Sequence, residues 1–233
     1  VFSRPTLGKE RPGWGAVLMV RLYLTVEGQT EQAFAVDVLQ PHLAGFGVFV
    51  VKPRLTGLHG RRGDRIPRGG LLSTFGHAKR DIQRWLSEDQ SAEARFSTMV
   101  DLYKLPRDFP GYADAMRSAD PIVQAEVLEI ALGEELADKR FVPYVQVHEF
   151  ESLVLSEPQA FCSLFDNVQR RVEMLEKDIA NYDSPELINH GQHSHPKARI
   201  RTFIEDYDEN VDGPLLAAAI GLKTIREKCR HFD

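Results

Sequence analysis

The 233-residue chain is poor in cysteine, in net positive charge and in long apolar runs, and each shortage excludes something. Its two cysteines, Cys162 and Cys229, lie far apart and form no disulfide framework, which favours a reducing compartment and a cytoplasmic protein. The formal net charge is −5, so any binding of nucleic acid must come from a local basic patch. No stretch is apolar enough over sufficient length to span a membrane, and we expect no membrane partner.

Two common enzyme signatures are also missing. The sequence has no Walker-type phosphate loop, which argues against ATP hydrolysis by that route, and no Gly-x-Ser-x-Gly nucleophile elbow. The histidines His190, His193 and His195 have a spacing that could ligate zinc. No cysteine or further histidine lies nearby in the sequence, so we interpret this stretch as a polar loop.

The distribution of apolar residues predicts an α/β protein. Strand-like stretches alternate with helix-like stretches, which favours a mainly parallel sheet with helices on both faces. We predict strands at 20–27, 47–55, 96–103 and 141–151, and helices at 29–44, 71–88 and 120–139.

Three regions follow from this pattern. Residues 1–18 are rich in glycine, proline and charge and are interpreted as a disordered or mis-called leader, since Met19 immediately precedes the first strand. Residues 19–155 form the α/β core. Residues 156–233 are mostly helical and are expected to pack on that core.

Acidic side chains stand where the predicted strands end. Glu27 ends the first strand and Asp101 the third, while Glu149 and Glu151 end the fourth. In parallel sheets, sites form outside the carboxyl ends of the strands, so these carboxylates should converge. Such a cluster is tolerable when a cation offsets the repulsion, and hard oxygen ligands suit Mg²⁺ or Mn²⁺.

Each of these residues also has an ordinary structural interpretation. A single strand-end glutamate such as Glu27 is often a solvated loop residue or a helix cap. Glu31 lies one helical turn later and either compensates the helix dipole or supports the site from behind. His148 either orients a ligand or is a satisfied histidine at a strand end. Glu149 and Glu151 share a face only if the segment is extended, so one of them at most is a direct ligand.

Basic residues gather in two places. Six Lys or Arg against one acid lie between Lys52 and Arg68, in a glycine-rich loop suited to phosphate contacts, although a solvated loop explains the charge equally well. Lys197, Arg199 and Arg201 form a second basic stretch. The residues expected to contact nucleic acid are Arg61, Arg62, Arg65, Arg68, Lys197, Arg199 and Arg201.

Four strings carry a resemblance to a known family: "TVEGQTEQAF", "VDLYKLPRDFPGY", "VPYVQVHEFESLVLSEP" and "GPLLAAAIGLKTIREKCRHF". In this order they resemble the prokaryotic family called domain of unknown function 4276, from Met19 onward. That family is similar to TOPRIM-fold proteins, including nucleases of the overcoming-lysogenization-defect type. The resemblance implies a TOPRIM-like (Rossmann-like) sheet, metal ligands at Glu27 and Asp101, and a partner ATPase in defence against phage.

The sequence departs from the TOPRIM pattern at its second acid. The fold usually carries Asp-x-Asp, whereas Tyr103 stands at the second position here, and Glu149 or Glu151 would have to replace that ligand. The basic string after a proline also differs, reading "PKARI" at 196–200, and Lys197, Arg199 and Arg201 could compensate.

Three functions remain open at this stage. The leading hypothesis is a Mg²⁺- or Mn²⁺-dependent nuclease, or a related phosphodiester-processing enzyme, acting on DNA or RNA. The alternative is a non-catalytic module that binds nucleic acid or an ATPase, and a weaker one is a primase-like nucleotidyl transferase. The sequence also leaves open a homo-oligomer.

Overall fold

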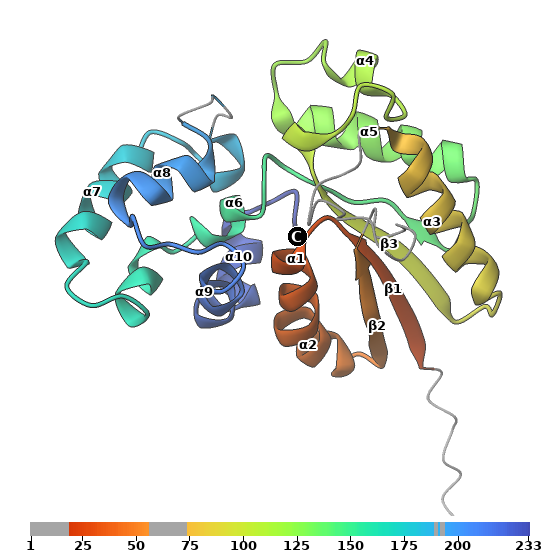
Figure 1. Ribbon diagram of the computed structural model, residues 1–233, viewed down its shortest axis with the longest axis horizontal. Coiled ribbons are helices and arrows are strands. Elements are labelled where there is room, and N and C mark those ends of the chain that lie inside the picture. Colours follow the sequence, from red (N-terminus) through yellow and green to blue (C-terminus); the bar gives the residue numbers. More distant parts are fainter. Residues whose placement is uncertain (1–18, 56–73, 189–190, 192–193) are drawn as a thin grey trace, which may run out of the picture.

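A parallel β-sheet lies in one half of the protein, on the right in Figure 1, and the C-terminal helices lie in the other half, on the left. The computed structural model describes residues 19–55, 74–188, 191 and 194–233. The strand order is β2-β1-β3-β4, all described pairings are parallel, and β5 pairs with the C-terminal end of β3. The predicted α/β architecture with a mainly parallel sheet is therefore confirmed. The strands are β1 (Val20–Val26), β2 (Val48–Leu55), β3 (Ala94–Asp101), β4 (Phe141–Val142) and β5 (Val145–Gln146).

Helices connect and cover the strands. A π-helical turn, η1 (Ala35–Leu39), joins α1 to α2, so the helix predicted at 29–44 is continuous but irregular. Within the described residues, no helix has both the length and the apolar character needed to cross a membrane. The α-helices are α1 (Gln29–Phe34), α2 (Gln40–Ala44), α3 (Phe75–Glu88), α4 (Tyr112–Ala115), α5 (Pro121–Leu136), α6 (Glu151–Val154), α7 (Gln169–Ile179), α8 (Pro196–Phe203), α9 (Asp212–Ile220) and α10 (Leu222–Lys228). The 3₁₀ turns are η2 (Leu102–Lys104), η3 (Pro158–Ser163) and η4 (Pro185–Leu187).

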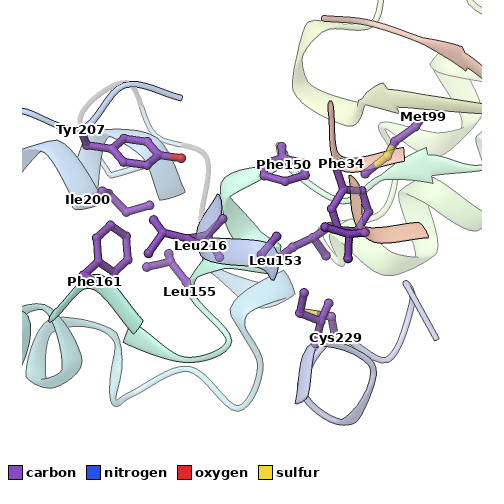
Figure 2. Packing of buried hydrophobic residues seen from close by; sticks show 14 of the residues in the cluster. Phe34, Met99, Phe150, Leu153, Leu155, Phe161, Ile200, Tyr207, Leu216 and Cys229 are labelled. Atoms are coloured by element: carbon purple, nitrogen blue, oxygen red, sulfur yellow. The ribbon is translucent and has the colours of Figure 1, made fainter. Parts of the chain in front are cut away.

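Each face of the sheet has its own hydrophobic cluster, because successive strand residues point to opposite faces. On one face, Phe96 and Val100 pack with residues of α3 and α5. On the other face, Leu24 and Val26 belong to a cluster that runs on through the C-terminal helices. Figure 2 shows this second cluster, from Phe34 and Met99 at the sheet to Ile200, Tyr207 and Leu216 among the helices. The helical region thus shares a continuous core with the sheet.

The fourth strand is much shorter than the predicted 141–151, and that prediction is wrong. Pro143 separates β4 from β5 and has no backbone N–H to donate to the sheet. The Thr98 hydroxyl takes over around this break: it accepts from Tyr144 N at 3.2 Å and donates to Tyr144 O at 2.8 Å. The segment after β5 then turns at His148, which has a φ of 60°.

Candidate metal centre

Glu27 and Asp101 lie together at the carboxyl edge of the sheet. Glu27 directly follows β1 and Asp101 is the last residue of β3, and these two strands are adjacent and parallel. Both residues are only 2% exposed. The backbone N–H of Asp101 donates to Glu27 Oε2 at 3.1 Å. The structure thus brings together two of the predicted strand-end acids, out of contact with bulk water.

Lys104 lies between these two carboxylates. Its ammonium Nζ is 2.9 Å from Glu27 Oε1 and 2.9 Å from Asp101 Oδ2. The turn η2 makes this possible, because residues three apart in a 3₁₀ helix lie one above the other. The second oxygen of Asp101, Oδ1, is buried and makes no hydrogen bond within the described part of the chain. One lysine therefore faces two buried acids.

Burial and mutual charge shift the pKa values of Asp101 and Lys104. Burial, and then the charge of Glu27, raises the pKa of Asp101 well above its usual range. Burial alone would lower the pKa of Lys104, but Asp101 and Glu27 together raise it overall, so the lysine stays protonated.

Glu31 lies behind this pair and has a structural task of its own. Its Oε2 accepts from the backbone N–H of Gly28 at 2.8 Å, which satisfies a free donor at the start of α1. Burial is the main cause that raises the pKa of Glu31, and Glu27 adds to it. Glu31 therefore caps α1, and its role in supporting the site stays a prediction.

A second acidic group surrounds Glu149, which is fully buried. Its Oε1 accepts from the backbone N–H of Lys197 at 2.6 Å and lies 2.7 Å from Nδ1 of His195. Because a carboxylate oxygen only accepts, Nδ1 carries the proton here, and its 3.4 Å approach to the Ala198 N–H is the weaker contact. Glu149 thus binds the N-terminus of α8, where its charge is favourable.

Glu151 lies in the same acidic group as Glu149, but the two side chains do not share one face of an extended strand. The turn at His148 places Glu151 as the first residue of α6, so the segment is not extended as far as Glu151. The Tyr207 hydroxyl lies 3.4 Å from Glu151 Oε1. Burial, and then the charge of Glu149, raises the pKa of Glu151 to about 8. We name these residues, Glu149, Glu151, His195, Lys197 and Tyr207, the α8 group.

Tyr103 joins the two groups. Its ring stacks on His195 with centroids 6.0 Å apart, while Lys104 Nζ lies 5.2 Å from the same ring. The backbone N–H of Tyr103 donates to the carbonyl of His148 at 3.5 Å. Burial, and then Glu149, raises the pKa of the tyrosine hydroxyl. Tyr103 and His148, both predicted to support the site, therefore lie between the sheet edge and α8.

The basic residues have unequal freedom to meet a substrate. Lys197 Nζ lies 3.9 Å from Glu149 Oε2 and 3.6 Å from Glu209 Oε1, beside the acidic group. Arg201 is half exposed and pairs with Glu209 at 2.7 Å. Arg199 instead ties α8 to α7 and its following turn, through an ion pair with Asp178 and a hydrogen bond to Tyr182. The predicted contacts Arg61, Arg62, Arg65 and Arg68 lie outside the described residues, as does the leader 1–18.

The donor set can be tested for its fit to Mg²⁺ or Mn²⁺. Asp101 Oδ1 and Glu149 Oε2 are buried acceptors without a hydrogen bond among the described residues, and hard oxygen ligands suit these ions. Within residues 19–55, 74–188, 191 and 194–233, however, no three Asp, Glu, His or Cys side chains are grouped closely enough to hold one ion. The set fits an ion held by two carboxylates, with water and substrate oxygens completing its shell.

Two residues that contact the buried acids were not predicted from the sequence as part of the site. Lys104 was not predicted, although a basic residue three positions after a strand-end acid is the available signal. His195 was interpreted as part of a polar loop, and it does precede the helix as the N-cap of α8, but its contact with Glu149 was not predicted. Its position directly before Pro196 is a helix-start pattern that could have indicated this.

The protein is thus an α/β protein with buried acids at the carboxyl edge of a parallel sheet. A family model described as "Domain of unknown function (DUF4276)" matches residues 26–233, and the chain belongs to this family. Among solved structures, the chain is similar to the C-terminal region of the Xanthomonas campestris pv. campestris OLD protein. That similarity has 16% sequence identity and a TM-score of 0.36, and it covers 91% of this chain and 93% of that one. No curated protein matches the chain.

Proposed function

We propose that the protein is a Mg²⁺- or Mn²⁺-dependent nuclease or a related phosphodiester-processing enzyme. The observation that carries this proposal is the Glu27–Asp101 pair, buried at the carboxyl ends of adjacent parallel strands. Two acids removed from water cost free energy unless a cation compensates them. The unsatisfied Oδ1 of Asp101 supports a ligand at this place.

In this proposal the chain's own residues divide the work. Glu27 and Asp101 hold the ion, whereas Glu149 and Glu151 belong to the α8 group and do not complete a three-ligand set with them among the described residues. A bound Mg²⁺ or Mn²⁺ supplies charge stabilisation at a phosphoryl oxygen and a more acidic water. Lys197 of the α8 group and nearby Arg201 both pair with Glu209, and a phosphate could replace Glu209 as their partner. Glu31 and His148 support the ligands from behind.

One observation favours a second function, a non-catalytic module that binds nucleic acid or an ATPase. Lys104 already offsets much of the charge of Glu27 and Asp101, so these acids have a cationic partner without any metal. A degenerate site would have the same appearance. The ATPase partner, the role in phage defence and the cytoplasmic location rest on sequence arguments and remain predictions.

A cleavage assay separates the two functions. Single- and double-stranded DNA and RNA are incubated with the wild-type protein in Mn²⁺ or in EDTA, beside Glu27→Gln. Glu135→Gln is the matched control, since Glu135 also pairs with a lysine but has a side chain that is 41% exposed. We expect Mn²⁺-dependent cleavage that falls by roughly 100-fold or more in Glu27→Gln alone, because a metal contributes several kcal/mol to such a step.

The readouts also define failure. Cleavage that persists in Glu27→Gln, with the protein folded, excludes the proposed site. Absence of both cleavage and Mn²⁺ binding, measured by calorimetry, favours the non-catalytic module. Mn²⁺ binding without cleavage indicates that a partner is required, and the assay is then repeated with a candidate ATPase.

A further inference from the structure

The position of Lys104 determines which oxygens of Glu27 and Asp101 an ion could contact. Glu27 has two carboxylate oxygens, and both are in use: Oε2 accepts from the Asp101 N–H and Oε1 contacts the Lys104 ammonium. On Asp101, Oδ2 contacts the same ammonium, while Oδ1 lacks a hydrogen bond within the described residues. The ammonium thus bridges Glu27 Oε1 and Asp101 Oδ2, and a divalent ion that bridges the two acids through these same oxygens must take its place.

We propose that Lys104 is an internal counterion that must leave Glu27 and Asp101 before a divalent ion can bind both, and that it thereby sets the metal affinity of the site. This inference rests on the proposed metal function. An ammonium and a divalent cation repel each other when they share two carboxylates at short range. Part of the metal's binding free energy is then used to displace the lysine.

The Lys104 side chain is more exposed to solvent than the two acids that it contacts. Its side chain is 34% exposed, whereas those of Glu27 and Asp101 are 3% exposed, so the cation has access to water that the acids lack. Its stem is flexible, and the Tyr103 ring, whose centroid is 5.2 Å from the ammonium, offers a second weak partner for the charge. The acids stay in place, because Glu27 is fixed by the Asp101 backbone and Asp101 ends a paired strand.

The alternative is that Lys104 is a permanent substitute for the metal, which would make the site structural. The two cases differ in one measurable quantity, the sign of the change in Mn²⁺ affinity when the lysine charge is removed. A displaceable counterion competes with the metal, so its loss tightens metal binding. A permanent substitute belongs to a site that binds no metal.

The experiment is a calorimetric Mn²⁺ titration of the wild-type protein, Lys104→Met and Lys104→Arg. Lys79→Met is the matched control, because Lys79 pairs with Glu135 and has a side chain that is 32% exposed. We expect Lys104→Met to bind Mn²⁺ about tenfold more tightly, or better, than the wild type. Lys104→Arg keeps the charge and Lys79→Met keeps the site, so both should retain the wild-type affinity.

A second measurement covers the case in which Lys104→Met is unstable without metal, since it leaves buried acids without a cation. Thermal unfolding is followed in EDTA and in Mn²⁺ for the same proteins. The shift in melting temperature caused by Mn²⁺ should be larger in Lys104→Met than in the wild type, because stabilisation grows with affinity. An equal or smaller shift overturns the inference.

The failures are distinguishable. If Mn²⁺ binds the wild type and Lys104→Met binds it equally or less well, the metal site stands and the counterion role falls. If neither protein binds Mn²⁺, both proposals fall. In the intact wild-type protein, the nitrogen-15 signal of the Lys104 ammonium should also change on addition of Mg²⁺, and an unchanged signal under saturating Mg²⁺ contradicts displacement.

Discussion

The sheet-edge acids and those of the α8 group are both buried, but they are compensated in different ways. At the sheet edge, Glu27 and Asp101 face one flexible lysine side chain. In the α8 group, Glu149 accepts from a backbone N–H at a helix N-terminus and contacts His195. A side-chain cation can move away, whereas the N-terminus of a helix cannot move without unpacking that helix. The first group is therefore suited to exchanging ligands, and the second to holding the helical region against the sheet.

The largest effect on stability should come from removing Glu149, the acid of the α8 group that binds the helix N-terminus. We expect Glu149→Ala to lower the free energy of unfolding by about 3 kcal/mol or more, because it leaves the α8 N-terminus, His195 and Lys197 without their partner. Urea unfolding in EDTA measures this, with exposed Glu205→Ala as the control. A loss below about 1 kcal/mol, typical of surface pairs, would contradict the comparison.

An intermediate effect concerns pH. A carboxyl group with a raised folded-state pKa takes up protons more readily when folded, so its contribution to stability falls as pH rises. For Glu151 this window runs from the ordinary 4.5 to about 8. In EDTA, Glu151 alone should contribute a loss of stability across this window with a slope of at most about 1.4 kcal/mol per pH unit. Glu151→Gln should flatten that slope, and an unchanged urea midpoint profile would place the titration elsewhere.

A smaller effect probes how tightly the α8 group is packed. A Cβ at Gly213, the second residue of α9, would lie 3.1 Å from the Tyr207 hydroxyl and 3.2 Å from Phe150. We expect Gly213→Ala to cost about 1–2 kcal/mol, since rigid rings must shift. Gly76 is also the second residue of its helix, but it has nothing within 4 Å of the added Cβ.

Gly76→Ala should accordingly be neutral or stabilise by up to about 1 kcal/mol, through helix propensity alone. Thermal unfolding of both variants gives the comparison directly. If Gly213→Ala is as well tolerated as Gly76→Ala, the contacts around Tyr207 are loose and the α8 group is not rigid.

The two groups also differ in how far the sequence predicts them. The places of Glu27 and Asp101 follow from strand alternation and from the rule for parallel sheets, both of which depend on local pattern. Lys104 depends on a three-residue 3₁₀ turn, which the sequence does not distinguish from an ordinary loop. The α8 group requires α8 to dock against the turn at His148, and such packing between segments far apart in sequence leaves no periodic signal. Pro143 ended the fourth strand early, which the apolar run of 141–151 concealed.

The continuous cluster on one face of the sheet has a consequence for how the chain folds. Leu24 of β1 and Cys229, beyond α10, belong to the same cluster although roughly two hundred residues separate them. Contacts of such long range must overcome a large loop-closure entropy before they stabilise anything, which slows folding. During synthesis, the strands are made first, and this face of the sheet stays exposed until the C-terminal helices are made and can pack on it. Until then, chaperones would be expected to bind its exposed apolar strands.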